Sequence, residues 1–255
     1  MDKPADDPKR APLPATCPDA RHDQAAGPPP DPASTDLPAP GAAGDDALFQ
    51  ATLDRLDARQ DCWIFAYASL LWRPEFEASE VRRARLWGWH RALEMRSRIN
   101  RGTHAQPGLV FALVAGGSCV GQVLRLPRER APAELRRLWL REMPGGGVYT
   151  PRWLRCDCAE GPVQALAFTL ARSHPSYTGV LGEAQLERIL RQARGRYGST
   201  LDYLLQTADR LDALGIRDRK LAQVARLGRR IAAELAAPDD RDASGTPLPA
   251  PPQRG

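Results

Sequence analysis

An apolar run of ten residues, WIFAYASLLW at positions 63–72, sets the strongest limit on the folds open to this chain. Its first half is a short, continuous apolar segment, which is typical of a buried strand. The run then changes character at Tyr67, Ala68 and Ser69, where an aromatic residue, a small residue and a hydroxyl follow one another. We expect a tight loop over residues 67–70 with free backbone N–H groups, and such a nest of amides can hold a carboxylate.

Proline-rich segments at both ends limit how much of the chain can fold. Residues 1–46 hold 11 of the 24 prolines, with only two leucines and no other large aliphatic or aromatic residue. Such a segment buries too little apolar surface to offset the entropy lost on ordering. Residues 237–255 repeat this composition on a smaller scale. We therefore expect two disordered tails and one domain at 47–236, which is an ordinary single-domain length.

Charge is divided unevenly between the N-terminal tail and the expected domain. Residues 1–46 carry a net charge of −5, whereas residues 47–236 carry 30 basic and 19 acidic residues, a net charge of +11. A basic surface attracts anions, including nucleic acids. No nucleic-acid recognition motif accompanies the charge, so we expect no nucleic-acid partner, although an anion- or nucleic-acid-binding module stays an alternative.

The remaining bulk features favour a cytoplasmic protein. No stretch of 18 apolar residues is present for a membrane helix, and the N-terminus has no apolar core for a secretory signal. The five cysteines are irregularly spaced, and Cys156 and Cys158 form one short pair without a second. A zinc site is therefore not expected, and free thiols in a reducing compartment are the simpler interpretation.

The order of hydrophobic patterns indicates an α+β domain, with strands first and most helices last. Gly116 and Gly117 lie between two strand-like runs and predict a hairpin turn. Ser199 and Asp202 are spaced as a variant of the capping box at a helix start. The expected strands cover 62–67, 85–98, 109–114, 119–126, 148–156 and 163–171, and the expected helices cover 47–60, 132–143, 184–194, 199–214 and 217–236.

Glu142 is the strongest candidate for chemistry on physical grounds. It lies at the i+7 position from Leu135, in line with Leu138 and Trp139, on the apolar face of the helix expected at 132–143. Burial and the nearby helix C-terminus both raise the pKa of a carboxyl group toward the range useful for proton transfer. The alternative is that Glu142, as a residue of the last turn, points into water. Glu134 is a second acid on this helix, and a solvated role suits it better.

Several short motifs occur in one order and together carry a family resemblance. Residues 138–143 (LWLREM) with Tyr149 resemble the segment around the catalytic glutamate of the ChaC family of γ-glutamylcyclotransferases, and residues 63–72 resemble its first substrate-binding signature. Further matches are NRGT at 100–103, PGLV at 107–110, GGSC at 116–119, HPSY at 174–177, GSTLDYL at 198–204 and LGIRD at 214–218.

This resemblance implies a γ-glutamylcyclotransferase fold, a small mixed β-barrel surrounded by helices. It implies a lyase that cleaves glutathione into 5-oxoproline and cysteinylglycine, with Glu142 as acid and base and with no metal or organic cofactor. The substrate is a small molecule and no membrane is involved; the protein would act as a monomer or homodimer. The implied substrate-binding residues are Ala66, Tyr67, Ala68, Ser69, Leu70, Leu71, Arg101, Tyr149 and Tyr203.

Two departures from the family pattern leave alternatives open. Ala66 and Ala68 stand where the family usually has glycine, and alanine in a left-handed backbone costs about 1 kcal/mol. The turn at 144–148 is one residue longer than usual. The alternatives are a cyclotransferase for another γ-glutamyl amino acid or amine, and a catalytically weak binding protein on the same fold. Arg101 could also occupy a solvated turn, and Tyr149 and Tyr203 could be packing residues.

Overall fold

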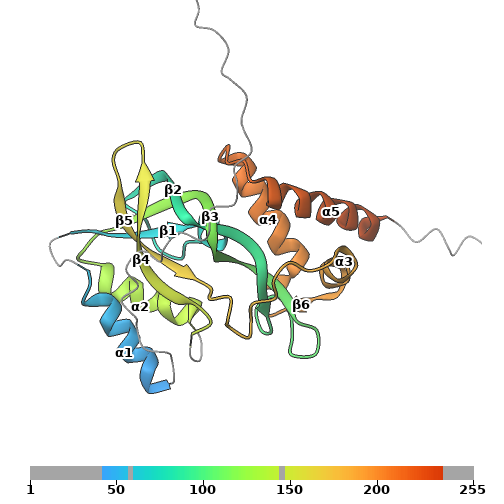
Figure 1. Ribbon diagram of the computed structural model, residues 1–255, viewed down its shortest axis with the longest axis horizontal. Coiled ribbons are helices and arrows are strands. Elements are labelled where there is room, and N and C mark those ends of the chain that lie inside the picture. The colour runs from blue at the N-terminus through green and yellow to red at the C-terminus, as the bar shows by residue number, and fades with distance from the viewer. Residues whose placement is uncertain (1–41, 57–59, 144–146, 238–255) are drawn as a thin grey trace, which may run out of the picture. The chain divides into compact units, whose positions relative to one another are not determined.

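The computed structural model describes residues 42–56, 60–143 and 147–237 (Figure 1). Helix α1 (Ala42–Leu53) begins within the segment that the composition assigns to the N-terminal tail. Most of both expected tails, residues 1–41 and 238–255, lies outside the described residues, so their disorder stays a prediction. Among the described residues, no helix combines the length and the apolar character needed to cross a bilayer.

Five strands close into a barrel in the order β1-β3-β2-β4-β5, and β5 returns to β1. The closing β1–β5 pairing is parallel, whereas the other neighbours around the barrel are antiparallel, so the barrel is mixed, as the resemblance implies. The side chains of Phe65, Leu86 and Ala165 share the inner face of the barrel and are essentially inaccessible to solvent. The strands are β1 (Cys62–Ala66), β2 (Glu80–Ser97), β3 (Gly108–Leu126), β4 (Thr150–Cys158) and β5 (Val163–Thr169).

The hairpin predicted at Gly116 and Gly117 is wrong. Both glycines lie inside the single 19-residue strand β3 and have φ values of 106° and 70°. Opposite them the register with β2 shifts, from Trp87 paired with Ser118 to Trp89 paired with Ala115. The glycine pair therefore forms a bulge, for which a left-handed backbone serves as well as it does for a turn. The chain reverses instead between β2 and β3, over residues 98–107.

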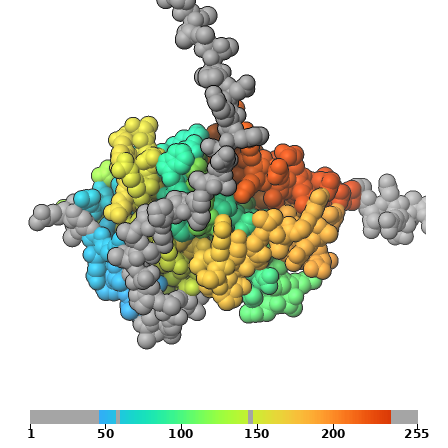
Figure 2. Space-filling model, in the orientation of Figure 1, coloured from blue at the N-terminus to red at the C-terminus, as the bar shows by residue number. Residues whose placement is uncertain are grey.

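Two groups of helices pack against the barrel (Figure 1 and Figure 2). The first pairs α1 with α2 (Ala131–Glu142), where the ring of Phe49 meets that of Trp139 edge-on at 5.2 Å. In the second, α4 contacts β3 and α5 contacts β2. This second group consists of α3 (Glu183–Gln192), α4 (Thr200–Ala213) and α5 (Arg219–Ala236), with the short strands β6 (Arg194–Gly195) and β7 (Gly198–Ser199) leading into α4.

Local sequence signals explain where α2 and α4 begin. A proline occupies the first turn of α2, where a missing N–H costs nothing. At the start of α4, Ser199 accepts a hydrogen bond from the Asp202 amide, and the Asp202 carboxylate accepts one from the Ser199 amide. This reciprocal pair is the capping box that the spacing predicts. It fixes the first turn of the helix that carries Tyr203.

Candidate active site

Residues from six segments meet around a narrow cavity at one end of the barrel. Strands β1 and β5 are parallel and end there, while β4 is antiparallel to β5 and begins there. The cavity measures about 20 Å³, room for about one water molecule. It is lined by Tyr67, Ala68, Ser69, Leu70, Phe111, Glu142, Tyr149, Phe168 and Tyr203.

Glu142 is the last residue of α2, and its carboxylate faces this cavity. Glu142 lies on the buried face of its helix, which also carries Leu135, Leu138 and Trp139. Its side chain is therefore only 15% exposed. Desolvation raises the pKa of Glu142, the adjacent Arg141 opposes this rise, and the negative charge of Glu75 adds to it. The cavity therefore holds a carboxyl group with a raised pKa beside the hydroxyl groups of Tyr67, Tyr149 and Tyr203. The turn at 144–146 lies outside the described residues.

Arg141 joins Glu142 to the loop that follows β1. Its Nε lies 3.2 Å from Oε1 of Glu142, and its Nη2 donates to Oγ of Ser69 at 3.1 Å. Its Nη1 donates to the carbonyl of Arg73 at 2.7 Å and lies 3.5 Å from Oε1 of Glu75. One guanidinium group therefore fixes the acid against the loop, a role that the sequence analysis missed.

The loop after β1 has the free amides that its sequence predicts. Residues 69–71 form a single 3-10 turn, η1 (Ser69–Leu71), in which the Leu71 amide donates to the carbonyl of Ala68. The N–H groups of Ala68, Ser69 and Leu70 have no acceptor among the described residues. Because these residues also line the cavity, three unsatisfied donors border the space in front of Glu142.

The two alanines that replace family glycines do not adopt a left-handed backbone. Ala68 has φ −142°, and Glu75 is the single non-glycine residue with positive φ in the described part of the chain. Ala66 is fully buried, and Ala68 is 5% exposed. The cost of about 1 kcal/mol expected for alanine in a left-handed conformation therefore does not arise here.

Three tyrosine hydroxyls differ in what their protons do. The Tyr67 hydroxyl donates to the carbonyl of Phe168 at 3.2 Å, so its oxygen accepts from Tyr149 in the hydrogen bond that joins the two phenols. The Tyr203 oxygen accepts from the amide of Phe111 at 3.2 Å, and its own proton has no acceptor among the residues that the structure describes. Burial is the largest cause that raises the pKa of all three phenols, so each stays protonated at neutral pH.

Arg101 lies behind Tyr203 and is not part of the cavity wall. It is 7% exposed, its Nη1 donates to the carbonyl of Tyr197, and its guanidinium carbon lies 5.1 Å from the centre of the Tyr203 ring. Desolvation is the largest cause that lowers its pKa. The structure thus replaces the solvated turn considered as an alternative with a buried cation stacked on Tyr203.

The cavity collects seven of the ten predicted site residues. Ala66, Leu71 and Arg101 stand outside its lining. Sequence reasoning missed Phe111 and Phe168, because an aromatic residue in a strand gives no local sign of whether it lines a site or a core. Glu134, the second acid on α2, pairs instead with Arg137 at 3.0 Å.

A family model described as ChaC-like protein matches residues 62–230. Two curated relatives are the glutathione-specific γ-glutamylcyclotransferase of Escherichia coli K12, 37% identical over 68% of this chain and 74% of its own length, and the human glutathione-specific γ-glutamylcyclotransferase 1, 31% identical over 65% of this chain and 77% of its own length.

A solved structure supports the same fold. It is a γ-glutamylcyclotransferase specific to glutathione from yeast, with a TM-score of 0.62 and 17% identity over 67% of this chain and 96% of that chain. At this identity the likeness shows the fold alone, and it agrees with the mixed barrel predicted from the resemblance.

Proposed function

The chain belongs to the ChaC-like protein family, and from this membership we propose that it is a γ-glutamylcyclotransferase that cleaves glutathione into 5-oxoproline and cysteinylglycine. The observation that carries the proposal is the position of Glu142, a largely buried carboxyl group that shares a narrow cavity with the unsatisfied amides of the loop after β1. No metal or organic cofactor is required for this reaction.

The loop amides are suited to hold the α-carboxylate of the γ-glutamyl group. The N–H groups of Ala68, Ser69 and Leu70 supply donors without needing a side-chain charge. With the carboxylate held there, the γ-glutamyl chain can bend so that its α-amino nitrogen approaches its own γ-carbonyl carbon. Fixing this geometry lowers the barrier by removing much of the entropy cost of ring closure.

Glu142 carries the proton transfers. Its carboxylate takes a proton from the α-ammonium group, so that the neutral amine attacks the γ-carbonyl and forms the new C–N bond of the five-membered ring. The same group then delivers this proton to the departing cysteine nitrogen as the old amide bond breaks. It next takes the second proton that the ring nitrogen carries after the attack and passes it to the freed amine, so that glutathione yields two products without water and Glu142 ends as a carboxylate. Desolvation strengthens Glu142 as a base by raising its pKa, which suits a group that must both accept and return a proton.

Tyr203 is the phenol best placed to bind substrate. Its proton finds no acceptor within the described residues, whereas the protons of Tyr67 and Tyr149 are committed to Phe168 and Tyr67 respectively. A neutral hydroxyl can donate to the oxygen that becomes negative when the amine attacks. We assign Tyr203 this role, and we assign Arg101 the role of holding its ring.

Product analysis of two variants, one test and one control, tests this proposal. Purified protein is incubated with glutathione, and 5-oxoproline and cysteinylglycine are quantified for the parent, for Glu142→Gln and for the matched control Glu134→Gln. We expect the parent and Glu134→Gln to form the two products at the same rate. Glu142→Gln should form them at least about a hundredfold more slowly, which is the contribution typical of one general acid–base group.

Other results would point elsewhere. Full activity of Glu142→Gln would overturn its assigned role. Inactivity of the parent toward glutathione, with turnover of a γ-glutamyl amino acid or amine, would favour the alternative substrate class. Inactivity toward all of them would indicate a binding protein on the same fold. The cytoplasmic location and the monomeric or dimeric state remain predictions from the sequence.

A further inference from the structure

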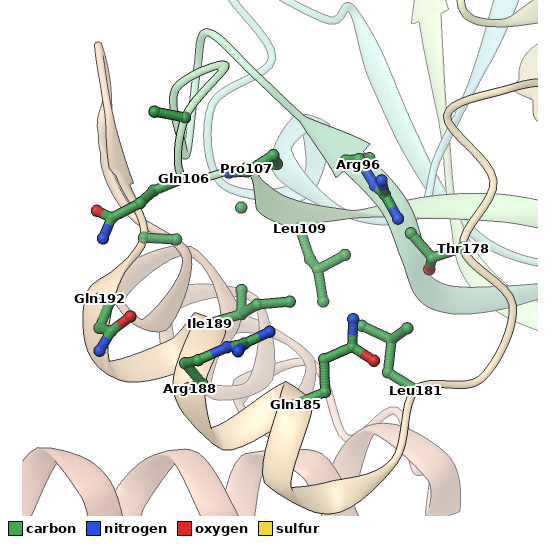
Figure 3. Close-up of a pocket in the computed structure, with 13 residues that line it drawn as sticks. Arg96, Gln106, Pro107, Leu109, Thr178, Leu181, Gln185, Arg188, Ile189 and Gln192 are labelled. Carbon is green, nitrogen blue, oxygen red and sulfur yellow. The ribbon is translucent and has the colours of Figure 1, made fainter.

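A second and larger cavity lies between the barrel and α3, where no predicted site residue is found (Figure 3). Its volume of about 400 Å³ falls in the range typical of small-molecule sites. One wall is formed by β2, the start of β3 and the loop before it, and the opposite wall by α3 and the loop that precedes it.

Among the described residues that line this cavity, the charged side chains are two arginines, with no acid. Arg96 enters from the end of β2 and Arg188 from α3, on opposite walls (Figure 3). Neither guanidinium group has an acceptor in the described part of the chain. Nearby acids are engaged elsewhere, because Glu187 pairs with Arg191 and Glu94 accepts a hydrogen bond from Tyr177. Both cations are therefore available to an anionic ligand.

The surface between the two arginines is apolar and edged by carboxamides. Ile189 and Leu181 border the space between the arginines, and Leu109, which is buried, lies beneath it (Figure 3). Gln106, Gln185 and Gln192 stand around the rim and can each donate and accept hydrogen bonds. A single inorganic ion would leave this apolar surface uncovered, whereas a molecule with two anionic ends and a short carbon chain would contact all of it.

We propose that this cavity is a binding site for a small organic dicarboxylate, with one carboxylate held by Arg96 and the other by Arg188. Guanidinium groups bind carboxylates through paired hydrogen bonds, and such charge-assisted bonds are the strongest of their kind. The proposal does not depend on the reaction assigned to Glu142, because the two cavities share no lining residue.

The walls of the cavity are held in place without a ligand. The amide of Thr103 donates to the carbonyl of Gln106 at 2.9 Å, and the amide of Gln106 donates to Oγ1 of Thr103 at 3.0 Å. On the other side, the amide and the hydroxyl of Thr178 both donate to the carbonyl of Glu94. A site that is already formed loses little entropy on binding, which favours affinity for small ligands.

Calorimetric titration with glutarate tests the proposal on the full chain. We expect saturable binding of one glutarate per chain, weakened about tenfold or more in Arg96→Gln and in Arg188→Gln, because each removes charge-assisted hydrogen bonds. Arg98→Gln is the matched control, since it makes the same change in charge just beyond the end of β2 but outside the cavity lining; its affinity should stay within about twofold of the parent. Equal melting temperatures confirm that the variants are folded.

The proposal is overturned if glutarate shows no saturable binding in the millimolar range, if its binding is unchanged in both cavity variants, or if Arg98→Gln causes an equal loss. Acetate serves as the one-ended probe. If acetate binds as tightly as glutarate, the site takes a single carboxylate and the two-ended ligand is wrong. The titration is repeated with Glu142→Gln to separate the two sites. If glutarate binds in the cavity beside α3, its affinity for this variant should equal its affinity for the parent.

Discussion

At the scale of single residues, the pKa of Glu142 depends on Arg141, which lies near two carboxylates, Glu142 and Glu75. The guanidinium of Arg141 lies 3.2 Å from Glu142 and 3.5 Å from Glu75, so the charge that favours ionisation of Glu142 is shared with a second carboxylate. Glu75 is itself held in a left-handed backbone, with φ 63°. The other ionisable groups around Glu142 are the phenols of Tyr67, Tyr149 and Tyr203, which stay neutral.

Removing the charge of Glu75 should therefore move the pH profile. In Glu75→Gln we expect the pKa of Glu142 to fall, because a repulsive charge is lost and the positive charges of Arg141 and of Arg73, which pairs with Glu75 at 2.9 Å, are no longer offset by it. The proposed role of Glu142 as a base requires its ionised form, so the acidic limb of kcat/KM should move to lower pH. Initial rates between pH 4 and 9, read with about 0.1-unit precision, measure this shift.

Glu77→Gln is the matched control for that profile. Its side chain is 88% exposed and lies 3.8 Å from Arg130, away from Arg141. An acidic limb that moves equally in both variants, or that stays in place in Glu75→Gln, would contradict the effect of Glu75 on Glu142.

What the sequence could reveal at this scale depended on spacing. Glu142 was predictable because helical periodicity aligns it with three apolar residues that had to be buried. Arg141 was not, because its partners Ser69, Arg73 and Glu75 lie on a loop far away in the sequence, and no local pattern connects them. Nor did the sequence show that Ala68 would keep a negative φ, since this depends on how the loop is seated.

At the scale of elements, α4 shows what a local signal can predict. The capping box at Ser199 and Asp202 was readable because both partners lie within one turn. Gly116 and Gly117 show the opposite case. Two adjacent glycines permit a left-handed backbone, but whether this makes a turn or a bulge depends on β2, which pairs along both sides of them.

Loss of the cap should weaken α4 and, through it, the barrel. In Ser199→Ala the Asp202 amide loses its acceptor, and we expect unfolding to become easier by about 1 kcal/mol. Urea unfolding followed by circular dichroism measures this, with the exposed Ser173→Ala as a control that should change stability by less than about 0.5 kcal/mol. An unchanged midpoint in Ser199→Ala would show that the cap does not contribute.

At the scale of the whole domain, Arg91 ties distant parts together. Its side chain is 1% exposed, and its guanidinium donates to the carbonyls of Tyr67 and Val120 and to the carboxylate of Asp218, which caps α5. One buried cation thus joins the loop after β1, strand β3 and the last helix. Such pairing across the fold is invisible to sequence periodicity, as is the parallel β1–β5 pairing that closes the barrel.

Replacing Arg91 by methionine should be severe. Two buried carbonyls lose their donor and Asp218 loses its partner, so we expect a loss of about 3 kcal/mol in the free energy of unfolding. Asp218→Asn, which keeps an amide capable of accepting from Arg91, should lose less. A loss below about 1 kcal/mol for Arg91→Met would show that water replaces these contacts.

Shortened chains test where the domain begins. Leu48 is 3% exposed, Phe49 packs on Trp139, and the indole of Trp153 donates to the carbonyl of Thr52 at 3.2 Å, so α1 supports both α2 and β4. A chain that starts at residue 42 should keep the melting temperature and turnover of the parent, because the composition of the removed segment provides little apolar surface. A chain that starts at residue 60 should be less stable by about 3 kcal/mol or more. Thermal melts and glutathione turnover of both chains decide between these outcomes.

The order of the strands along the chain also determines when, during translation, the barrel and the candidate active site can be completed. Of the barrel strands, β1 is synthesised first, yet it pairs with β3 and with β5, the last barrel strand to be synthesised. Tyr203 follows on α4, after every strand of the barrel has been made. A nascent chain therefore carries an open sheet edge through most of its synthesis, and a chain released before α4 holds Glu142 but no complete site. If Tyr203 has the role proposed for it, cleavage begins only once translation is nearly finished.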